Sequence, residues 1–513
     1  MQILSKSFHW LLKRRLNSLE KAINNPIATQ HALLKELIQQ GKETVYGEKF
    51  SYHSIDSVRT FQGRVPICTY EDLYPYILQT LQGMPKILWP TAIKWFAKSS
   101  GTTNDRSKYI PVSSEALEYG HYKAGKDMLA MYLANNPTSL LTQGKSLAMA
   151  GSLHKNTFSF ESNASTQYGD VSAVIMNNLP FWAKWISTPG IDITLLENWE
   201  EKIEKIAQWA TKEKNVTVLT GIPTWIYFLL YKILDKQQAN YITEVWPMLE
   251  LFIHGGISFQ PYKKLFTKIL PHQLHYLEVY NASEGFFAMQ DQLESNELLL
   301  LIDHGIYYEF IPIEDIHKPN KRVIDLSEVT LYTVYALVIT TNAGLWRYQI
   351  GDTIKFTCLV PYRIQIVGRT KQFINTFGEE LMVQDAETAI AHACMVTEAL
   401  INDYTAGPCY LSGTQKGRHE WIIEFIKPPA NLDKFTDILD QQLQFVNSDY
   451  EAKRYNDMLL IKPLIKSVPR GVFYTWMKQK NKLGEQNKVP RLYNSRKYLD
   501  SLHAVLQDIV TDE

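Results

Sequence analysis

Hydrophobic residues recur at helical spacing through the first 85 residues of the chain. Within residues 6–23 the apolar positions, interrupted by basic side chains, are Phe8, Leu11, Leu12, Leu16 and Leu19. This pattern predicts an amphipathic helix that docks on its own domain, and it lacks the continuous apolar run of a signal peptide. Thr69 followed by Asp72 predicts a helix start ahead of residues 73–81.

Between about residues 145 and 284 the pattern changes to short apolar runs that alternate with amphipathic segments. We interpret the short runs as strands over residues 216–219, 249–253 and 274–279. We interpret the amphipathic segments as helices over residues 197–214, 224–236 and 261–270. This alternation is typical of βαβ units and predicts a mostly parallel, doubly wound sheet.

The remaining chain divides into a β-rich part and a mixed part. β-Branched and aromatic runs predict strands over residues 297–302, 307–313, 330–340 and 348–356. From about residue 369 the pattern predicts helices over 383–393, 432–446 and 497–506 and strands over 422–426 and 459–465. We therefore expect an α/β fold: a large N-terminal domain with the doubly wound, mostly parallel sheet and a β-rich subdomain, then a smaller α+β C-terminal domain. The 513 residues exceed what a single core supports.

A loop rich in hydroxyl side chains follows the apolar run at residues 93–97. It consists of Ser99, Ser100, Gly101, Thr102, Thr103, Asn104, Asp105, Arg106, Ser107 and Lys108. Hydroxyls, backbone amides and a lysine can bind phosphate oxygens, although the spacing is not that of a Walker A loop. An ordinary Ser/Thr-rich surface loop has the same composition. Beyond it, Ser113 and Ser114 can cap a long helix that reaches about residue 133.

Polar and glycine residues follow each predicted strand of the parallel sheet, at residues 220–223, 254–256 and 280–284. Ligands bind outside the carboxyl ends of the strands in such sheets, so these segments favour one shared site. Gly255 and Gly256 would let a flat base approach the backbone, and Glu284 offers an oxygen ligand suited to Mg²⁺. Alternatively, paired glycines form tight turns and a lone glutamate is a solvated loop residue.

A further candidate is Asp352, which follows Gly351 between predicted strands. A carboxylate there can accept hydrogen bonds from both hydroxyls of a ribose. A carboxylate that only stabilises the turn would look the same in the sequence.

Charge and cysteine content narrow the class of protein. Lys+Arg and Asp+Glu both number 53, so the net charge implies no general attraction to nucleic acid or to a membrane. The four cysteines are far apart and form no CxxC pair, which indicates a reducing compartment without a zinc site or disulfide framework. No stretch approaches the roughly 18 apolar residues of a membrane span. We expect a soluble, cytoplasmic protein with no nucleic-acid or membrane partner.

Three segments in this order resemble the nucleotide motifs of the acyl-acid amido synthetases. They are residues 99–103 with Lys108, residues 280–285 and residues 348–352. That family, the auxin-responsive Gretchen Hagen family, is a branch of the adenylate-forming acyl-activating superfamily. The resemblance extends from the N-terminal helices to residues 490–491, nearly the whole chain.

The resemblance implies a ligase that uses ATP and Mg²⁺. Such enzymes form an acyl-adenylate from a small carboxylic acid, release pyrophosphate and pass the acyl group to the amine of an amino acid. The residues implied to hold the phosphates are Ser99, Ser100, Gly101, Thr102, Thr103 and Lys108. The other implied nucleotide residues are Gly255, Gly256 and Tyr280 around the adenine, Asp352 on the ribose, Ser283 beside the α-phosphate and Glu284 on Mg²⁺.

The resemblance also implies a mobile C-terminal domain. Residues 368–369 and 373–378 are similar to the superfamily's hinge entry, which puts Arg369 among the nucleotide residues. The implied domains are 1–367 for nucleotide and acyl acid, 368–376 for the hinge and 377–513 for the mobile part. Residues 486–491 resemble the C-terminal lysine motif and make Lys488 the cation for the reacting phosphate and carboxylate.

The sequence leaves several alternatives open. Asp105-Arg106 stand where the family often has glycine, and Gln349 stands where it usually has arginine; Arg347 is a possible substitute. A thioester-forming coenzyme A ligase and a catalytically silent nucleotide or acyl-acid binding protein are the competing functions. Candidate acyl-binding residues, whose aromatic members are more often core packing, are Tyr122, Lys123, Lys126, Trp225 and Tyr227. The acid, the amine and the oligomeric state are not specified.

Overall fold

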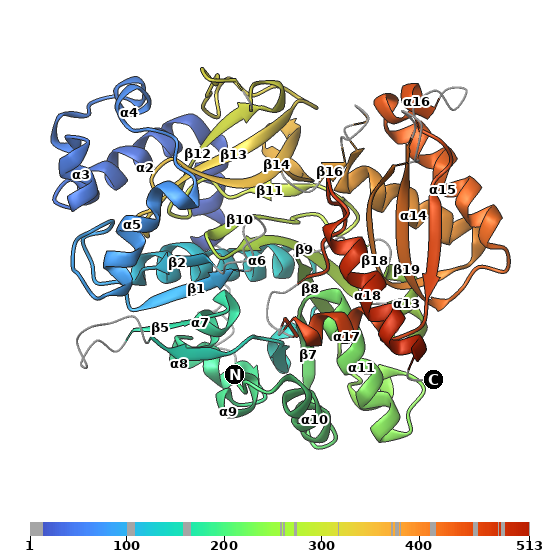
Figure 1. Cartoon of the computed structure of the whole chain (residues 1–513). Helices are drawn as coiled ribbons and strands as arrows, with labels where there is room; N and C mark the ends of the chain where they lie inside the picture. Colours follow the sequence, from blue (N-terminus) through green and yellow to red (C-terminus); the bar gives the residue numbers. More distant parts are fainter. Residues whose placement is uncertain are drawn as a thin grey trace. The chain divides into compact units, whose positions relative to one another are not determined.

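The computed structural model of the chain forms two compact units (Figure 1). It describes residues 14–99, 108–156, 166–256, 259, 262–270, 274–316, 318–370, 373–374, 379, 381–410, 417–454, 460–480, 482–483 and 488–511. Unit 1 comprises Met1–Gly221, Val245–Gly256 and Gln273–Gln365, and unit 2 comprises Ile222–Glu244, Ile257–His272 and Ile366–Glu513. Unit 2 therefore includes two segments from the middle of the chain, while the hinge at 368–376 stays a prediction.

Unit 1 is built on one mixed sheet whose strand order runs from β12 through β14 and β9 to β6 (Figure 1). In spatial order its eleven strands are β12 (Ile306–Pro312), β13 (Val334–Thr341), β14 (Tyr348–Leu359), β15 (Tyr362–Arg369), β11 (Leu298–Leu300), β10 (Gly285–Met289), β9 (His275–Ala282), β8 (Leu251–Gly255), β7 (Val216–Gly221), β3 (Lys145–Ala148) and β6 (Ser187–Thr188). The last residues of β15 cross into unit 2.

Half of this sheet is parallel, as the βαβ pattern predicts. β3 pairs in parallel with β6 and β7, β7 with β8, and β8 with β9. The first four residues of β7 and of β8 are all buried, which is the pattern of strands covered on both faces. The prediction of parallel strands at these positions is confirmed.

The predicted β-rich part continues the same sheet. β9 turns into β10 through the two residues between Ala282 and Gly285, and this hairpin reverses the strand direction. The pairings of β10 with β11, β11 with β15, β14 with β13 and β13 with β12 are antiparallel. The sequence pattern separates the two halves by composition, but one hairpin joins them into one hydrogen-bonded layer.

Helix α6 (Tyr122–Asn135) covers the parallel half of the sheet. Ala124, Met128 and Tyr132 lie four residues apart and so share one face of the helix. The strand residues in the same core cluster include Val218, Leu251, Leu277 and Phe286. The predicted helix start is confirmed at Ser113, whose Oγ accepts a hydrogen bond from the Ala116 amide at 2.8 Å. Residues Ala116–His121 form a wider π-type segment before α6.

Unit 1 also contains further helices and a second, smaller sheet. Residues 14–24 are helical, and the helices that follow are α2 (Pro26–Gly41), α3 (Val45–Lys49), α4 (Val58–Arg64), α5 (Tyr70–Leu81), α7 (Val171–Asn177), α8 (Phe181–Ile186), α9 (Ile191–Thr194) and α10 (Trp199–Ala210). The second sheet has the order β2 (Lys108–Val112), β1 (Trp95–Ser99), β5 (Gln167–Gly169) and β4 (Leu153–Lys155). The helix predicted after Thr69 is confirmed as α5, whose capping box joins Thr69 to Asp72.

Unit 2 packs helices on a small sheet of order β18 (Leu400–Tyr410), β19 (Gly417–Lys427) and β20 (Leu464–Val468). Its other elements are α11 (Pro223–Gln237), α13 (Lys263–Ile269), β16 (Phe373–Ile374), β17 (Leu381–Met382), α14 (Val383–Thr397), α15 (Leu432–Val446), α16 (Ser448–Arg454), α17 (Val472–Gln479) and α18 (Lys497–Thr511). The short helix α12 (Ile242–Val245) lies where the two units meet in the sequence. The three predicted C-terminal helices are confirmed, whereas β18 and α17 were not predicted.

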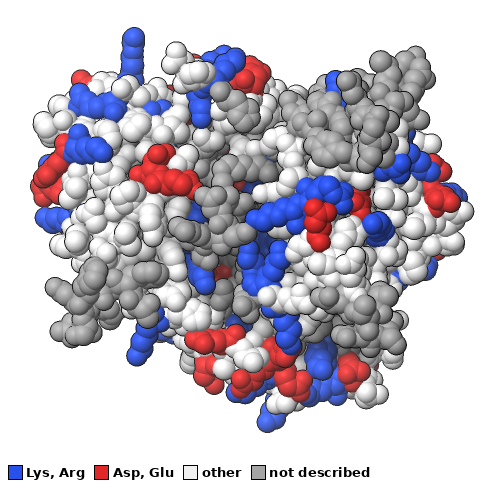
Figure 2. Space-filling view, viewed as in Figure 1, with Lys and Arg blue, Asp and Glu red and all other residues white. Residues whose placement is uncertain are grey.

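Surface charge and hydropathy agree with the composition. Figure 2 shows basic and acidic side chains interspersed on the face in view. A membrane-crossing helix is absent from the described part of the chain, since none there combines the necessary length and hydropathy.

Candidate functional site

Strand β14 carries the third motif, and an irregularity in its backbone determines the direction of the Asp352 carboxylate. The register between β13 and β14 shifts from Val338 opposite Gln349 to Ala336 opposite Thr353. Gly351 lies within this bulge at φ 92°, a left-handed conformation that favours glycine. The glycine that precedes Asp352 is therefore required by the backbone, and the bulge sets the direction of the carboxylate.

The second and third motifs meet directly. Tyr280 Oη on β9 donates to Asp352 Oδ2 on β14 at 2.6 Å, and both residues are buried. These strands are not neighbours in the sheet, since β10, β11 and β15 lie between them in the strand order. Two motifs that are 72 residues apart thus share one hydrogen bond.

The first motif reaches β14 through its lysine. Ser99 and Lys108 are opposite each other in the β1–β2 hairpin, so the loop between them is the hairpin connection. Lys108 Nζ lies 3.4 Å from Tyr348 Oη and 5.4 Å from the centroid of the Tyr70 ring. Burial raises the pKa of Tyr70, so its ring is a neutral platform for the ammonium. Ser100, Gly101, Thr102 and Thr103 lie outside the described residues.

Tyr348 is a site residue that the sequence reasoning did not assign. Its side chain is fully buried, and its hydroxyl brings Lys108 to the strand that also carries Asp352. The available signal was an aromatic hydroxyl at the start of the third motif.

The two glycines after β8 have backbone reasons to be glycine. A Cβ on Gly255 would lie 2.4 Å from the carbonyl oxygen of Val279 on β9, and Gly256 has φ 83°. Burial lowers the pKa of the preceding His254 to about 3, so that side chain is neutral near pH 7. The predicted contact of Gly255 and Gly256 with adenine stays a prediction.

Ser283 and Glu284 form the turn between β9 and β10, at the carboxyl end of a parallel strand. Ser283 is buried, and Glu284 is partly exposed. Within the described ranges, no group of three or more His, Cys, Asp or Glu side chains is arranged to hold a metal ion alone. A nucleotide-bound Mg²⁺ needs only one or two protein carboxylates, because phosphates and waters complete its shell. Glu284 fits that requirement.

Arg347 does not replace the arginine that is missing at Gln349. Its Nε and Nη2 each lie 2.9 Å from an oxygen of Glu309, and the residue is only 4% exposed. Its Nη1 donates to the carbonyl oxygens of Gln62 and Val65 at 2.8 and 2.6 Å. The Arg347 guanidinium is therefore bound in an internal ion pair with Glu309.

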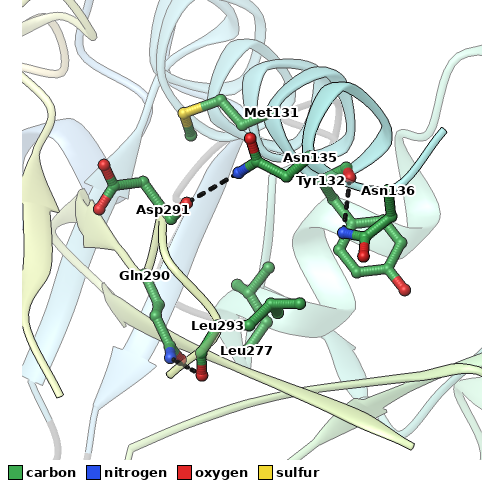
Figure 3. Close-up of a pocket in the computed structure, with 8 residues that line it drawn as sticks. All are labelled: Met131, Tyr132, Asn135, Asn136, Leu277, Gln290, Asp291 and Leu293. Atoms are coloured by element: carbon green, nitrogen blue, oxygen red, sulfur yellow. Dashed lines mark hydrogen bonds between the residues drawn. The ribbon is translucent and has the colours of Figure 1, made fainter. Parts of the chain in front are cut away.

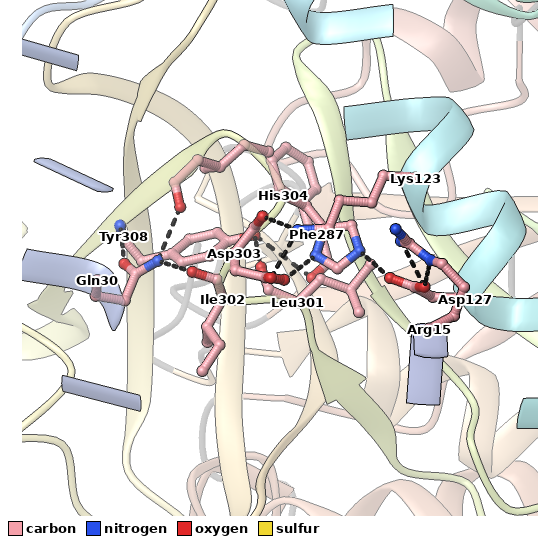
Figure 4. Close-up of polar contacts among 11 residues, drawn as sticks. Arg15, Gln30, Lys123, Asp127, Phe287, Leu301, Ile302, Asp303, His304 and Tyr308 are labelled. Carbon is pink, nitrogen blue, oxygen red and sulfur yellow. Dashed lines mark hydrogen bonds and ion pairs between the residues drawn. The ribbon is translucent and has the colours of Figure 1, made fainter. Parts of the chain in front are cut away.

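Of the predicted acyl-binding residues, three lie on α6. Tyr122 Oη donates to the carbonyl oxygen of Ile175 at 3.1 Å, and Lys126 forms an ion pair with Glu118 at 2.9 Å. Lys123 Nζ lies 2.6 Å from Asp303 Oδ2, within a chain of polar side chains drawn in Figure 4. Its other members are Arg15, Asp127 and His304. Their roles toward an acid stay predictions.

The remaining predicted residues belong to unit 2. Trp225 and Tyr227 are on α11, where the Tyr227 ring contacts that of Phe266 at 5.7 Å between centroids. Arg369 ends β15, and Lys488 is exposed. Each keeps its predicted role as a prediction.

The pocket shown in Figure 3 lies elsewhere, on the α6 side of the sheet. Its lining consists of Met131, Tyr132, Asn135, Asn136, Leu277, Gln290, Asp291 and Leu293. Gln290 Nε2 donates to three carbonyl oxygens, and Asp291 binds Arg363 in a bidentate ion pair. Both polar groups already have partners within the protein, and none of the lining residues belongs to the nucleotide motifs.

Comparison with known families agrees with the motif geometry. The GH3 family N-terminal domain matches residues 15–275, more than half of the 513 residues. The chain belongs to the GH3 family. The family's central domain matches residues 299–369 and its C-terminal domain matches residues 384–497, so the resemblance read from the three motifs is confirmed.

The family's curated members share about a fifth to a quarter of their residues with this chain. It is 22% identical to the indole-3-acetic acid-amido synthetase GH3.3 of Arabidopsis thaliana, over 93% of this chain and 91% of the relative. It is 24% identical to the 4-substituted benzoates-glutamate ligase GH3.12 of the same plant, over 94% and 96%. A solved structure titled GH3.15 acyl acid amido synthetase superposes with a TM-score of 0.78 at 20% identity, over 95% of both chains, which shows the shared fold.

Proposed function

We propose that this GH3 family chain is an ATP-dependent acyl-acid amido synthetase. The observation that carries the proposal is the convergence on β14, where Asp352 accepts from Tyr280 and Tyr348 contacts Lys108. At least one residue from each motif thus takes part in these two contacts, and all four residues belong to unit 1. Relatives named as an indole-3-acetic acid-amido synthetase and as a 4-substituted benzoates-glutamate ligase support the same reaction.

The first half-reaction joins two anions. A carboxylate oxygen of the acid attacks the α-phosphorus of ATP, the new P–O bond forms, and the bond to the leaving pyrophosphate breaks. Positive charge must offset the repulsion, and no protein nucleophile is required. In this proposal Lys108 and Lys488 supply cations, and Glu284 would hold Mg²⁺, which neutralises phosphate charge when bound.

The second half-reaction transfers the acyl group. The amine nitrogen of an amino acid attacks the acyl carbonyl carbon, the C–O bond to AMP breaks, and the nitrogen loses a proton. Because this attack comes from another direction, a unit that turns about residues 368–376 would bring Lys488 for the first step and withdraw it for the second. The proposed substrates are a small carboxylic acid and an amino acid.

A second candidate is a protein that binds nucleotide without catalysis. The observation in its favour is that Gln349 lacks a cation and that Arg347 is held by Glu309. A motif with one cation fewer stabilises less of the charge that develops on the phosphates.

The test is acid-dependent exchange of ³²P-pyrophosphate into ATP. The acids are indole-3-acetate, 4-hydroxybenzoate and straight-chain fatty acids, each followed by mass measurement of products with the twenty amino acids or coenzyme A. Exchange together with an amide product supports the synthetase, whereas a thioester product replaces it with a coenzyme A ligase. ATP binding without exchange for any acid favours the silent binding protein.

A further inference from the structure

Arg491 is a deeply buried arginine in unit 2, only 6% exposed. Its Nη1 donates to the carbonyl oxygen of Tyr404 at 3.0 Å and to the carboxylate of Asp403. Its Nη2 donates to Tyr262 Oη at 2.6 Å, and its guanidinium carbon lies 4.5 Å from the centroid of the Tyr404 ring. Burying a charge is costly unless it is paired and hydrogen-bonded, and this environment provides both.

The main chain around Arg491 is fastened to β18 as well. The amide of Ala406 donates to the carbonyl oxygen of Arg491 at 2.8 Å, and the amide of Tyr493 donates to that of Ala406 at 3.1 Å. Thr405 Oγ1 donates to the carbonyl oxygen of Pro490 at 2.5 Å. Because β18 is an edge strand, its free edge can pair with this segment, and Ala406 forms an isolated parallel bridge with Leu492.

Lys488 immediately precedes the fastened segment. It is exposed, whereas the next residue, Val489, is 8% exposed and packs in a core cluster with Trp476 and Tyr498. An exposed lysine beside two anchors has few backbone dihedrals that can move it. The orientation of the Lys488 backbone therefore depends on contacts made one and three residues later.

We propose that Arg491 is a positioning residue for Lys488, which acts through its contacts with Asp403, Tyr404 and Tyr262 and does not touch substrate itself. This inference rests on the proposed function, in which Lys488 serves adenylation. Tyr262 directly precedes α13, whereas Asp403 and Tyr404 lie on β18, so Arg491 fastens the lysine segment to two separate parts of unit 2.

Arg491→Lys keeps one positive charge but loses the fork that serves three acceptors. We expect it to slow acid-dependent pyrophosphate exchange by about 10- to 100-fold, the scale of a misplacement near 1 Å. Tyr262→Phe removes one hydroxyl only and should slow exchange by about threefold.

The matched control is Arg454→Lys. Arg454 is a partly buried arginine of unit 2, with a side chain 10% exposed, and its Nε and Nη2 bind Asp440 at 2.9 and 2.6 Å. Exchange by this variant should stay within about twofold of wild type, because Arg454 lies far in sequence from residue 488 and outside the proposed machinery.

A double-mutant cycle separates positioning from general damage. In a Lys488→Ala background, Arg491→Lys should change the exchange rate by less than about threefold, because there is no ammonium left to position. Hydrogen exchange read on peptides spanning residues 489–493 should become faster in Arg491→Lys and remain as in wild type in Arg454→Lys. Together these results would support the inference.

Equal losses from Arg491→Lys in the wild-type and Lys488→Ala backgrounds would overturn the inference and leave the proposed function standing. So would wild-type exchange rates in Arg491→Lys. If Lys488→Ala exchanges as fast as wild type, the role of Lys488 fails and the positioning role fails with it. If the wild-type protein shows no pyrophosphate exchange with any of the acids, the proposed function itself is wrong. The amide hydrogen exchange of the peptides still reports whether Arg491 anchors the segment.

Discussion

At the amino ends of β8 and β9, Glu250 and His275 meet through Tyr132, whose hydroxyl lies 2.5 Å from Glu250 Oε1 and 2.7 Å from His275 Nδ1. Ser139 Oγ and the Leu140 amide donate to the same glutamate at 2.5 and 2.7 Å. At the carboxyl ends of the strands, Tyr280 instead binds Asp352 on a strand that is not its neighbour.

The two ends have similar chemistry, since each joins a buried tyrosine to a carboxylate. They differ in what they connect. The amino-end cluster ties α6 and its following turn to the sheet beneath them, which is a packing role. The carboxyl-end contacts join three segments that are far apart in the sequence and that each carry one of the three motifs. Glycines lie at bends in two of these motifs. The comparison teaches that the connections of a polar cluster, more than its composition, indicate a ligand site.

Among the substitutions, Asp352→Ala should have the largest effect, because it removes the carboxylate at the carboxyl ends of the strands. We expect the KM for ATP to rise by about 10- to 100-fold, because hydrogen bonds to a charged group contribute about 1.5–3 kcal/mol. Steady-state exchange kinetics at varied ATP measure this. A KM within twofold of wild type would remove Asp352 from the site.

Glu250→Gln changes the carboxylate of the cluster at the amino ends of the strands. An NH2 group, which cannot accept a hydrogen bond, replaces one of its two oxygens, so the free energy of unfolding should fall by about 1–3 kcal/mol while the KM for ATP stays at the wild-type value. Urea unfolding and the same exchange kinetics check both parts. A raised KM with unchanged stability would reverse the roles that we assign to the two ends.

A matched pair of tyrosine substitutions sharpens the comparison at lower energy. Tyr280→Phe should raise the KM for ATP by about 2- to 10-fold, because it removes the hydroxyl that orients Asp352. Tyr132→Phe should leave the KM unchanged and lower stability by about 1 kcal/mol. Equal KM values for the two variants would mean that the contact between Tyr280 and Asp352 has no part in nucleotide binding.

The chain of polar side chains in Figure 4 gives the smallest effect, a change in how stability depends on pH in the acid range. Burial alone would raise the pKa of Asp303, but the hydrogen bond from His304 and the charge of Lys123 outweigh it and hold that pKa below its usual value. The resulting stability is present above the unfolded pKa of about 4 and is lost as pH falls toward the folded pKa.

Asp303→Asn should therefore flatten the acid limb of a plot of unfolding free energy against pH, by less than about 1.4 kcal/mol per pH unit. Urea unfolding at successive pH values below 4 measures the slope. An identical slope in wild type and variant would contradict the assigned pKa direction.

The sequence predicted the elements whose signal is local. β7, β8 and β9 are short apolar runs bounded by turns, and the helix after Thr69 has a capping box. The sequence did not predict β18, because it contains Gly407 and Pro408, a pair that is typical of a turn. Proline is nevertheless tolerated in an edge strand such as this one.

The parts of the site that could not be predicted depend on distant partners. The sequence could not show that Glu309 pairs with Arg347, because the two are 38 residues apart, one on β12 and the other just before β14. Nor could it show that Tyr348 contacts Lys108 across 240 residues. Motif order identified the residues, but three-dimensional pairing decides which of them meet.

The most direct test of the account is the affinity for ATP, measured by calorimetry without any acid substrate, for wild type, Asp352→Ala and Glu250→Gln. We predict that Asp352→Ala binds about 10- to 100-fold more weakly, while Glu250→Gln stays within about twofold of wild type. Unchanged affinity in Asp352→Ala, or an equal loss in both variants, would contradict the claim that the three motifs form one nucleotide site at the carboxyl ends of the strands.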